Sequence, residues 1–416
     1  MNGMMEPEIR FKGFEGEWEP FSLKDVCEIN PQSPLPETFE YVDLESVVGT
    51  SMVSHRTENR LTAPSRAQRL AKGGDIFYQT VRPYQKNNYL FVNQNTNFVF
   101  STGYAQLRTK IDSKYLFNIL QTDRFVNQVL LNCTGTSYPA INPTALSNLK
   151  IGITRNKTEQ KQIASCFKSL DALIQSATKK IASLKQLKSA SLVSMFPQEG
   201  EVKPRVRFKG FKEDWKTVPF DIVFRYLKNN TLSRADLNET LGSARNIHYG
   251  DILIKFGTLI DIRKDDLPYI TNHFLANQLT SNCKLQKGDI IFADAAEDST
   301  VGKCTEIAFI GEEKVVAGLH TIPCRTLFEF SEGYLGFYLN SPSYHNQLLP
   351  LMQGTKISSI SKSVLLNTSI SFPSSIAEQR QIASFFRSLD TQIFLETQRL
   401  DKLKQIKSAC LDKMFV

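Results

Sequence analysis

The clearest pattern in the chain is a helical stripe of apolar residues that occurs twice. In residues 158–196 and again in 377–415, apolar side chains recur at alternating steps of four and three, the spacing of one face of an α-helix. The first stripe consists of Ile163, Phe167, Leu170, Ile174, Ala177, Ile181 and Leu184. The second consists of Ile382, Phe386, Leu389, Ile393, Glu396, Leu400 and Leu403, so that one acid interrupts it. Each segment predicts one helix, about 55–60 Å long at 1.5 Å per residue.

The two helical segments are diverged copies of each other. They align without a gap at an offset of 219 residues and are identical at 21 of 39 positions. A second repeat precedes each copy, because IRFKGFEGEW at Ile9–Trp18 returns as VRFKGFKEDW at Val206–Trp215, at an offset of 197. Shorter matches join KGGDI (Lys72–Ile76) to QKGDI (Gln286–Ile290) and GTSYPAI (Gly135–Ile141) to GTKISSI (Gly354–Ile360). The chain is therefore one plan used twice, with 22 more residues in the second copy.

The single apolar stripe also predicts how the long helices are covered. A helix of this length with one apolar face needs a partner, and the best match is its own copy. We predict that the two helices pair as an antiparallel coiled coil within a pseudo-two-fold internal repeat. The alternative is that each helix packs only on its neighbouring domain. The length of the stripe and its presence in both copies favour the coiled coil.

The segments between the repeats predict two domains of mixed strand and helix. Short β-rich runs, bounded by Gly, Asn, Asp and Pro, lie at Phe39–Val48, Asp75–Val81, Asn97–Leu107, Asp289–Ala293, Thr305–Ile310 and Lys314–Cys324. Helices are expected at Lys114–Asn132 and Gly333–Met352. The predicted fold class is α+β. The expected boundaries are 1–156 for the first domain, 157–197 for the first long helix, 198–376 for the second domain and 377–416 for the second long helix.

A Gly-Thr pair follows each of the expected short helices, Gly135-Thr136 in the first copy and Gly354-Thr355 in the second. A glycine just past a helix permits the left-handed turn that ends it. The same pair in a loop offers backbone amides and a hydroxyl group to a phosphate. The sequence leaves both interpretations open.

The composition indicates which partners and which compartment the protein has. The net charge of +8 and the isoelectric point near 9.0 favour a polyanionic partner, although many proteins of this charge bind no nucleic acid. No run of about 18 apolar residues predicts a membrane span, and residues 1–14 lack the apolar core of a secretion signal. The seven cysteines include no CxxC pair, which favours reduced thiols over disulfides or a zinc site. A cytoplasmic protein is expected.

Loops of both domains gather side chains that suit DNA. Arginine can bond guanine and amide side chains can bond adenine, whereas lysine and hydroxyl groups suit phosphates. Each of these residue types taken alone more often marks a solvated loop than a DNA contact, so the collective tendency carries the prediction. The candidate DNA-binding residues are Arg82, Tyr84, Lys86, Thr136, Ser137, Ser233, Arg234, Arg245, Lys255, Thr355 and Lys356.

Sequence motifs for catalysis are missing. Asn30-Pro31 and Asn142-Pro143 lack the second proline and aromatic residue of an amino-methyltransferase loop, and no phosphate-binding glycine motif is found. The five histidines lack metal-ligand spacing. The acids Asp294, Glu297 and Asp298 form the one enzyme-like cluster; they equally fit a turn, or acceptors for a cytosine amino group. We therefore expect no catalytic residue and no metal site.

The chain resembles the specificity subunit of Type I restriction-modification systems over nearly its whole length, in several motifs that its repeats and domains contain. The resemblance rests on RFKGF…W before each domain, on GDIIFADAAEDSTVGK followed by VVAGLHTIPCR, and on GTKISSISKSVLLNTSISFPSSIAEQRQIASFF. The first half matches more loosely, at KGGDIFYQTVRPY and STGYAQLRT. That is expected if the first domain reads a different half of the target.

The resemblance implies a function without chemistry of its own. Each domain would be a target-recognition domain that reads one half of a bipartite target in double-stranded DNA, and the helix pair would set the spacer. Two methylation subunits would dock and carry S-adenosylmethionine, and two motor-nuclease subunits would use ATP and magnesium where the complex also cuts DNA. Thr136 and Thr355 would contact the DNA backbone. The alternatives are a single-chain restriction or modification enzyme and a coiled-coil scaffold that binds no DNA.

Overall fold

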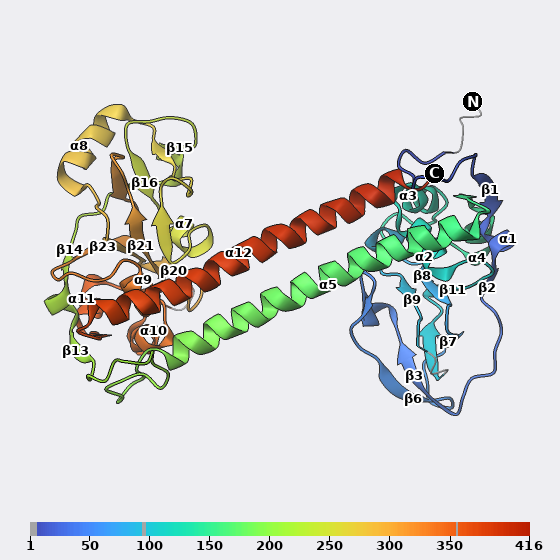
Figure 1. Ribbon diagram of the computed structural model, residues 1–416, viewed down its shortest axis with the longest axis horizontal. Helices are drawn as coiled ribbons and strands as arrows, with labels where there is room; N and C mark the ends of the chain where they lie inside the picture. Colours follow the sequence, from blue (N-terminus) through green and yellow to red (C-terminus); the bar gives the residue numbers. More distant parts are fainter. Residues whose placement is uncertain (1–5, 94–96, 355–356) are drawn as a thin grey trace. The chain divides into compact units, whose positions relative to one another are not determined.

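The computed structural model describes residues 6–93, 97–354 and 357–416, and the chain folds into two compact units. Unit 1 comprises Met1–Lys179 and Thr397–Val416, and unit 2 comprises Lys180–Glu396. Two long helices, α5 (Lys157–Ser194) and α12 (Ile376–Lys413), run without interruption (Figure 1). Unit 1 holds the start of α5 and the end of α12, and unit 2 holds the other ends. The two predicted long helices are confirmed.

Unit 1 is built on two four-stranded sheets. One has the strand order β6-β3-β10-β7 and the other β2-β11-β8-β9; β10 runs parallel to β3, and their other pairings are antiparallel. Two short sheets, β1-β12 and β4-β5, complete the unit. Its strands are β1 (Glu19–Ser22), β2 (Cys27–Ile29), β3 (Thr38–Val42), β4 (Val47–Val48), β5 (Ser51–Met52), β6 (Arg56–Asn59), β7 (Ala67–Leu70), β8 (Ile76–Gln79), β9 (Tyr89–Leu90), β10 (Phe98–Ser101), β11 (Tyr104–Thr109) and β12 (Lys150–Ile153). Its short helices are α1 (Leu23–Val26), α2 (Ser113–Gln121), α3 (Asp123–Leu131) and α4 (Pro143–Asn148).

Unit 2 repeats this plan with a larger sheet. A five-stranded sheet has the order β14-β23-β19-β21-β17, and a four-stranded sheet has the order β15-β18-β16-β22. Its strands are β13 (Lys216–Pro219), β14 (Phe224–Tyr226), β15 (Leu237–Asn238), β16 (Arg245–Ile247), β17 (Leu259–Asp261), β18 (Tyr269–Ile270), β19 (Ile290–Ala293), β20 (Ala295–Ala296), β21 (Cys304–Phe309), β22 (Val315–Ala317), β23 (Thr321–Thr326), β24 (Ser358–Ser359) and β25 (Ser369–Phe372). Its short helices are α6 (Phe220–Val223), α7 (Tyr249–Ile254), α8 (His273–Cys283), α9 (Tyr334–Leu339), α10 (Pro342–Leu348) and α11 (Lys362–Leu366).

Matched pairings show that the two units share one topology. β11 lies between β2 and β8 in unit 1, and β23 lies between β14 and β19 in unit 2. The parallel pair β3–β10 corresponds to β16–β22, and the antiparallel pair β1–β12 to β13–β25. Unit 2 replaces the small strands β4 to β7 with α7, β17, β18 and α8. The predicted α+β class and internal repeat are confirmed.

Two of the predicted helices are in fact broken. The segment predicted as one helix at 114–132 is divided into α2 and α3 by Thr122, whose backbone is extended and whose hydroxyl oxygen accepts a hydrogen bond from the Phe125 amide at 3.2 Å. The segment at 333–352 is divided at Ser341, which is extended and precedes a proline in the first turn of α10. A capping hydroxyl at Thr122 and the proline after Ser341 divided helices that periodicity alone would have continued. Six short helices, α1, α4, α6, α7, α8 and α11, were not predicted.

In unit 1 the two long helices pack against each other in opposite directions. The rings of Phe167, near the start of α5, and Phe415, just after α12, stack at a centroid distance of 5.6 Å. Two turns away from Phe415, Lys407 forms an ion pair of 2.6 Å with Asp171. Because the partner number falls as the α5 number rises, the helices are antiparallel. The stripe residues of α5 in this unit are buried or partly buried.

In unit 2 the end of α5 and the start of α12 form the same antiparallel pairing. Phe386 stacks on Phe196 at 5.8 Å, and Asp390 forms an ion pair of 2.5 Å with Lys188, the counterpart of Lys407. Glu396, the one acid in the apolar stripe, forms an ion pair of 2.5 Å with Lys180. The predicted antiparallel seam is therefore present in each unit, and the acid in it has a basic partner.

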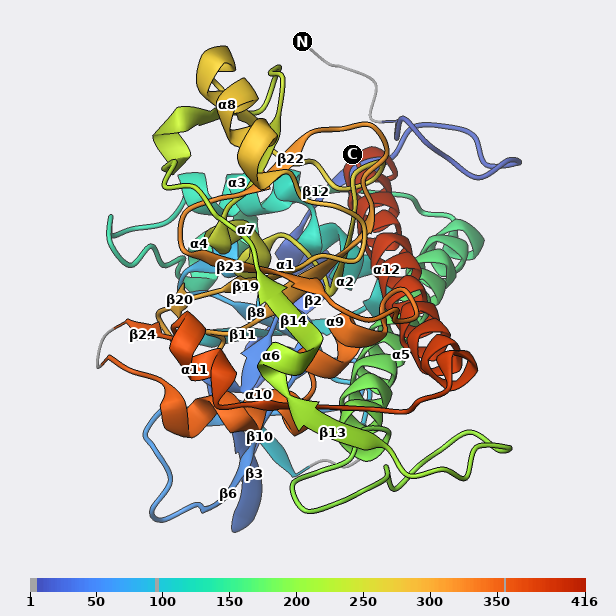
Figure 2. The same cartoon turned by 90° about the vertical axis from the view of Figure 1, so that its left-hand side faces the viewer.

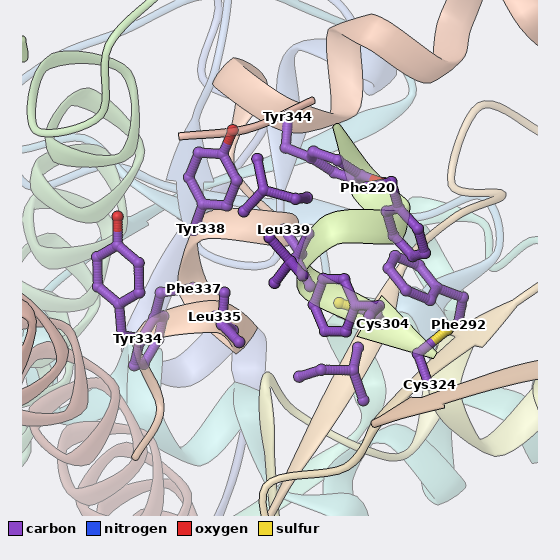
Figure 3. Close-up of a cluster of buried hydrophobic side chains, with 14 of the residues drawn as sticks. Phe220, Phe292, Cys304, Cys324, Tyr334, Leu335, Phe337, Tyr338, Leu339 and Tyr344 are labelled. Carbon is purple, nitrogen blue, oxygen red and sulfur yellow. The ribbon is translucent and has the colours of Figure 1, made fainter. Parts of the chain in front are cut away.

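The hydrophobic core of each unit joins the domain to the helix ends. Trp18 packs edge-on against Phe415 at 6.2 Å, and its counterpart Trp215 packs against Phe196 at the same distance. Figure 3 shows part of the core of unit 2, where Tyr344 of α10 lies near Phe220 and Phe292 and the aromatic side chains of α9 belong to the same cluster. The repeated tryptophan therefore anchors each domain to the end of one long helix.

Candidate nucleic-acid interface

Three loops of unit 1 meet at one residue, Thr80, immediately after β8. Its amide and hydroxyl groups both donate to the carbonyl oxygen of Gly103, in the turn between β10 and β11, at 3.0 and 2.8 Å. Its own carbonyl oxygen accepts from the amide of Ile141, at the end of the Gly-Thr loop, at 3.0 Å. We call this meeting point the junction of unit 1, defined by Thr80, Gly103 and Ile141.

Unit 2 has a junction with the same connections. The amide of Asp294, immediately after β19, donates to the carbonyl oxygen of His320 at 3.1 Å, and the amide of Ile360 donates to the Asp294 carbonyl oxygen at 2.9 Å. The neighbouring strands β20 and β24 pair with each other, and Figure 2 shows them side by side. The junction of unit 2, defined by Asp294, His320 and Ile360, thus repeats the hydrogen bonds of unit 1 with different side chains.

The glycine of each Gly-Thr pair is required by geometry. Gly135 has φ +85° and Gly354 has φ +108°, a region that favours glycine. A Cβ atom would lie 3.1 Å from the carbonyl oxygen of Tyr138 in the first loop and 2.0 Å from that of Ile357 in the second. Since α3 ends at Leu131 and α10 at Leu348, neither glycine directly follows its helix. The helix-capping interpretation was wrong, and the glycines shape a loop.

The structure brings several candidate residues of unit 1 to this loop. Thr136 and Ser137 are exposed in it. The guanidinium of Arg82 lies 4.3 Å from the ring centre of Tyr138, and the Arg82 amide donates to Pro139. Thr355 and Lys356, the corresponding candidates of unit 2, lie outside the described residues.

The other two candidates of unit 1, Tyr84 and Lys86, differ in whether their side chains are bonded within the unit. Tyr84 is half exposed. Lys86 is engaged within the unit, because its Nζ donates to the carboxylate of Asp123 at 2.6 Å and to the carbonyl oxygen of Gln121 at 2.9 Å. Its amine binds the boundary between α2 and α3. Arg82 and Tyr84 therefore remain the better placed candidates for contact with DNA.

The candidates of unit 2 that the structure describes make intramolecular contacts. Arg234 donates to both carboxylate oxygens of Asp251, at 3.0 and 2.8 Å, and the Ser233 hydroxyl donates to Asp236. Arg245 donates to the carbonyl oxygen of Leu267 at 2.9 Å. These bonds hold loops in place. Half of the Arg234 side chain is exposed, so its outer face stays accessible.

Lys255 and Arg245 support the same segment of unit 2. The Lys255 amine donates to the carbonyl oxygen of Asp266, next to the carbonyl oxygen that Arg245 binds. The Arg245 guanidinium also lies 4.2 Å from the ring centre of Tyr269, and only 14% of its side chain is exposed. The structure therefore gives both residues a supporting position, although their residue types suited DNA.

Two acids from the repeated GDI motif are also structural. Asp75 accepts two hydrogen bonds from Arg108, at 3.0 and 2.8 Å, and Asp289 accepts two from Arg325, both at 2.7 Å. Each carboxylate also accepts from a backbone amide three residues earlier. The motif repeats because it closes a turn and fixes the neighbouring strand.

Sequence reasoning missed His320, which lies beside the acid cluster. Its Nδ1 lies 3.1 Å from Oδ1 of Asp294, and its ring packs edge-on against Tyr249 at 5.2 Å. Burial raises the pKa of Asp294. The three residues are distant in sequence, so only the fold unites them. Asp298 makes the local turn that was one interpretation of the cluster, since it accepts from the Thr300 amide at 2.8 Å.

Within residues 6–93, 97–354 and 357–416, no group of three His, Cys, Asp or Glu side chains is arranged to hold a metal ion. No helix in that part of the chain is both long and apolar enough to cross a membrane.

Comparison with known proteins decides the family. The model of the Type I restriction modification DNA specificity domain matches twice, at residues 15–186 and 212–405. The chain belongs to this family. The specificity subunit of the Type I restriction enzyme HindI from Haemophilus influenzae is 26% identical over 191 residues, which are 43% of this chain and 41% of that relative. The alignment thus spans less than half of the relative's length.

Two solved structures share the fold. The Type I restriction-modification S subunit from M. genitalium has a TM-score of 0.60 at 14% identity, with 99% of each chain covered. A chain from a study of assembly and conformational transition of the type I restriction-modification system has a TM-score of 0.57 at 21% identity, covering 95% of this chain and 97% of its own. The family assignment confirms the prediction of a Type I specificity subunit, a non-catalytic component of such systems.

Proposed function

We propose that this specificity subunit reads a bipartite target in double-stranded DNA, with one half of the target read by each unit. The main support is the pair of junctions, which have the same backbone hydrogen bonds but carry different side chains. A common frame with different side chains suits two readers of different sequences, because base edges are distinguished by side-chain donors and acceptors. The exposed Thr136 and Ser137 suit phosphate contacts that fix the register.

The chemistry of the complex belongs to other subunits in this proposal. Methylation subunits would carry S-adenosylmethionine, and any motor-nuclease subunits would use ATP and magnesium. The net charge of +8 suits attraction to DNA and to acidic protein surfaces alike. We also place the complex in the cytoplasm, where its DNA substrate is found.

A duplicated surface on the long helices supports two docking sites for methylation subunits. Identical residues would be expected at exposed positions of both copies if both bind the same partner. The flank of the helix pair carries such a set in each unit. In unit 1 it consists of the exposed Asp171, Lys404 and Ser408 and the partly buried Leu411. In unit 2 it consists of the exposed Lys185 and Ser189 and the partly buried Asp390 and Leu192.

In unit 1 this flank forms one wall of a groove. The groove has a volume of about 1010 Å³, and residues of the domain, including Tyr89 and Phe117, form the opposite wall. Its lining includes five lysines and one aspartate: Lys114, Lys168, Lys179, Lys404, Lys407 and Asp171. A partner surface with acidic and apolar side chains would complement it. We propose that one methylation subunit docks here and a second docks on the matching flank of unit 2.

The long helices suit a spacer between the two half-targets. Each has 38 residues, which gives about 57 Å at 1.5 Å per residue. One turn of DNA is about 34 Å long. In the proposal, the length of the helix pair determines how many unread base pairs separate the half-targets.

The deciding experiment maps modified bases in the genome of cells that carry this chain with its partner subunits. The proposal predicts a split motif with one modified base in each half. A continuous motif, or no motif, would contradict it. Methyl transfer or cleavage by the purified chain alone would support the single-chain enzyme instead. DNA affinity that does not fall with salt would support the scaffold, since phosphate contacts give a steep salt dependence.

A further inference from the structure

The junctions of the two units differ at two side chains that their shared hydrogen bonds hold in place. Unit 1 has Thr80 and Gly103 where unit 2 has Asp294 and His320. At Gly103 there is no room for a side chain, because a Cβ atom would lie 2.8 Å from the side chain of Leu44. Unit 2 therefore projects an imidazole ring from a turn where unit 1 projects nothing.

The backbone of His320 is strained to present that ring. Its φ of +53° lies in the left-handed region, which few residues other than glycine adopt, although histidine, asparagine and aspartate do so more often than most. Strained residues of this kind cluster at functional sites, where the surrounding structure holds them. Half of the His320 side chain is exposed to solvent, at 51%. The strain thus serves an exposed polar group rather than a packed core.

Two neighbours fix the orientation of the ring. Asp294 lies 3.1 Å from Nδ1, and 26% of its side chain is exposed, so the pair is partly shielded from water. The ring also packs edge-on against Tyr249, at a centroid distance of 5.2 Å and an interplanar angle of 74°. An ionised carboxylate can only accept hydrogen bonds, so in this contact Nδ1 carries the proton. In the neutral ring Nε2 is then an acceptor.

We propose that His320, positioned by Asp294, reads a base in the half-target of unit 2 by accepting a hydrogen bond at Nε2. This inference rests on the proposed function. In the part of the chain that the structure describes, no hydrogen bond occupies Nε2. The donors that base edges offer in the major groove are the amino groups of adenine and cytosine. The residue should therefore favour one of these two bases, and Asp294 acts as its positioning residue.

The test compares target preferences of complexes assembled with the partner subunits on a library of randomised DNA duplexes. The main variant is His320→Gly, since glycine adopts a positive φ without strain and the fold should persist. We expect it to reduce the preference for adenine or cytosine at one position of one half-target by about 10- to 100-fold. The other half-target should keep its preferences.

Asp294→Asn tests the positioning role. The amide still offers an oxygen to Nδ1 but removes the charge, so the same position should lose a smaller part of its preference. His273→Ala is the matched control, because His273 is an exposed histidine of the same unit on α8. It should leave all preferences unchanged. Thermal unfolding of each variant verifies that the fold is kept.

Each result bears on one proposal only. A split target whose preferences are all unchanged in His320→Gly would overturn this inference and leave the proposed function standing. A guanine or thymine at the affected position would overturn the acceptor role of Nε2. If the unaltered complex selects no split target, the proposed function itself fails.

Discussion

The guanidinium of Arg207 donates two hydrogen bonds, of 2.7 and 2.9 Å, to the carboxylate of Glu378, whose side chain is only 1% exposed. Arg10 and Glu159 form the same bidentate pair in unit 1, at 2.6 and 3.0 Å. The arginine belongs to the motif that opens each domain, and the glutamate to the start of a long helix. Two motifs that look separate in the sequence are thus the two sides of one contact.

Breaking this contact should destabilise unit 2 strongly. In Arg207→Ala the Glu378 carboxylate would remain buried without its cation, which typically costs about 3–5 kcal/mol. The midpoint of unfolding in urea, followed by circular dichroism, measures the effect. Arg205→Ala is the control, because Arg205 pairs with Glu201 at the surface. Equal effects of the two substitutions would show that the buried pair is not a main support of the unit.

Glu306 should make the stability of unit 2 depend on pH. Its carboxylate accepts from the amides of Gly333 and Gly336 at 2.6 and 2.9 Å, but burial raises its pKa to about 7. In the folded protein the carboxyl group keeps its proton to a higher pH than in the unfolded chain. Its contribution is therefore complete below about pH 4.5 and is lost as the pH rises through about 7.

The substitution Glu306→Gln removes this titration. We expect the variant to gain stability relative to the unaltered chain between pH 5 and pH 8, by up to about 3 kcal/mol at about 1.4 kcal/mol per pH unit. The loss of one carboxylate acceptor changes the free energy of unfolding equally at both pH values. Unfolding curves of both proteins at the two pH values give the difference, and a difference independent of pH would contradict the prediction.

The Gly-Thr loop of unit 2 should tolerate no side chain at its glycine. In Gly354→Ala the new Cβ atom would lie 2.0 Å from the carbonyl oxygen of Ile357, so the loop must open. Under the proposed function we expect at least a tenfold loss of DNA affinity, measured by fluorescence anisotropy on the assembled complex. Gly210→Ala is a matched control, since Gly210 also has a positive φ but has open space around it. Equal losses would point to backbone strain alone.

Reversing the charge of one lysine on a duplicated flank should block the docking site of that unit. Lys404→Glu and Lys185→Glu are the matched substitutions in units 1 and 2. We expect each single variant to bind one methylation subunit and the double variant to bind none, because the proposed partner surface is acidic. Native mass spectrometry counts the bound subunits. Lys402→Glu, an exposed lysine that has Ser183 as its counterpart, should still bind two.

Shortening both helices together should shorten the target. Removing residues 176–182 and 396–402 takes seven residues, one heptad, from each helix and deletes both partners of the Lys180–Glu396 ion pair. The helices lose about 10 Å each, so the spacer should shorten by about three base pairs while both half-targets stay the same. Genome-wide mapping of modified bases reports the spacer, and an unchanged spacer would reject the role of the helices as a ruler.

The sequence predicted the parts of the fold that depend on repetition. The stripe from Ile163 to Leu184 specified α5, because heptad spacing over about six turns allows few other structures. It did not reveal the break at Thr122, where one hydroxyl group ends a helix and begins the next. Periodicity records which residues are buried, whereas a cap depends on one local hydrogen bond.

The candidate site was only partly predictable. Arg82 and the Gly-Thr loop of unit 1 were found from residue type, and the structure places them together. Arg245 and Lys255 have the same chemistry, yet their groups bind the backbone of residues 266–267. His320 could not be found, since its position depends on a turn and on an acid 26 residues earlier. Residue type indicates what a side chain can bind, but the fold decides whether it is available.

The same backbone hydrogen bond joins the start of a domain to the end of a long helix in both units. In unit 2 the amide of Val206 donates to the carbonyl oxygen of Ser194 at 2.9 Å, and a short covalent segment joins these two residues. In unit 1 the amide of Ile9 donates to Lys413 at 3.0 Å, although nearly the whole polypeptide separates them. The contact therefore forms whether or not a short covalent segment joins its two residues. Two half-length polypeptides, cut between Gly200 and Glu201, should accordingly reassemble when they are produced together.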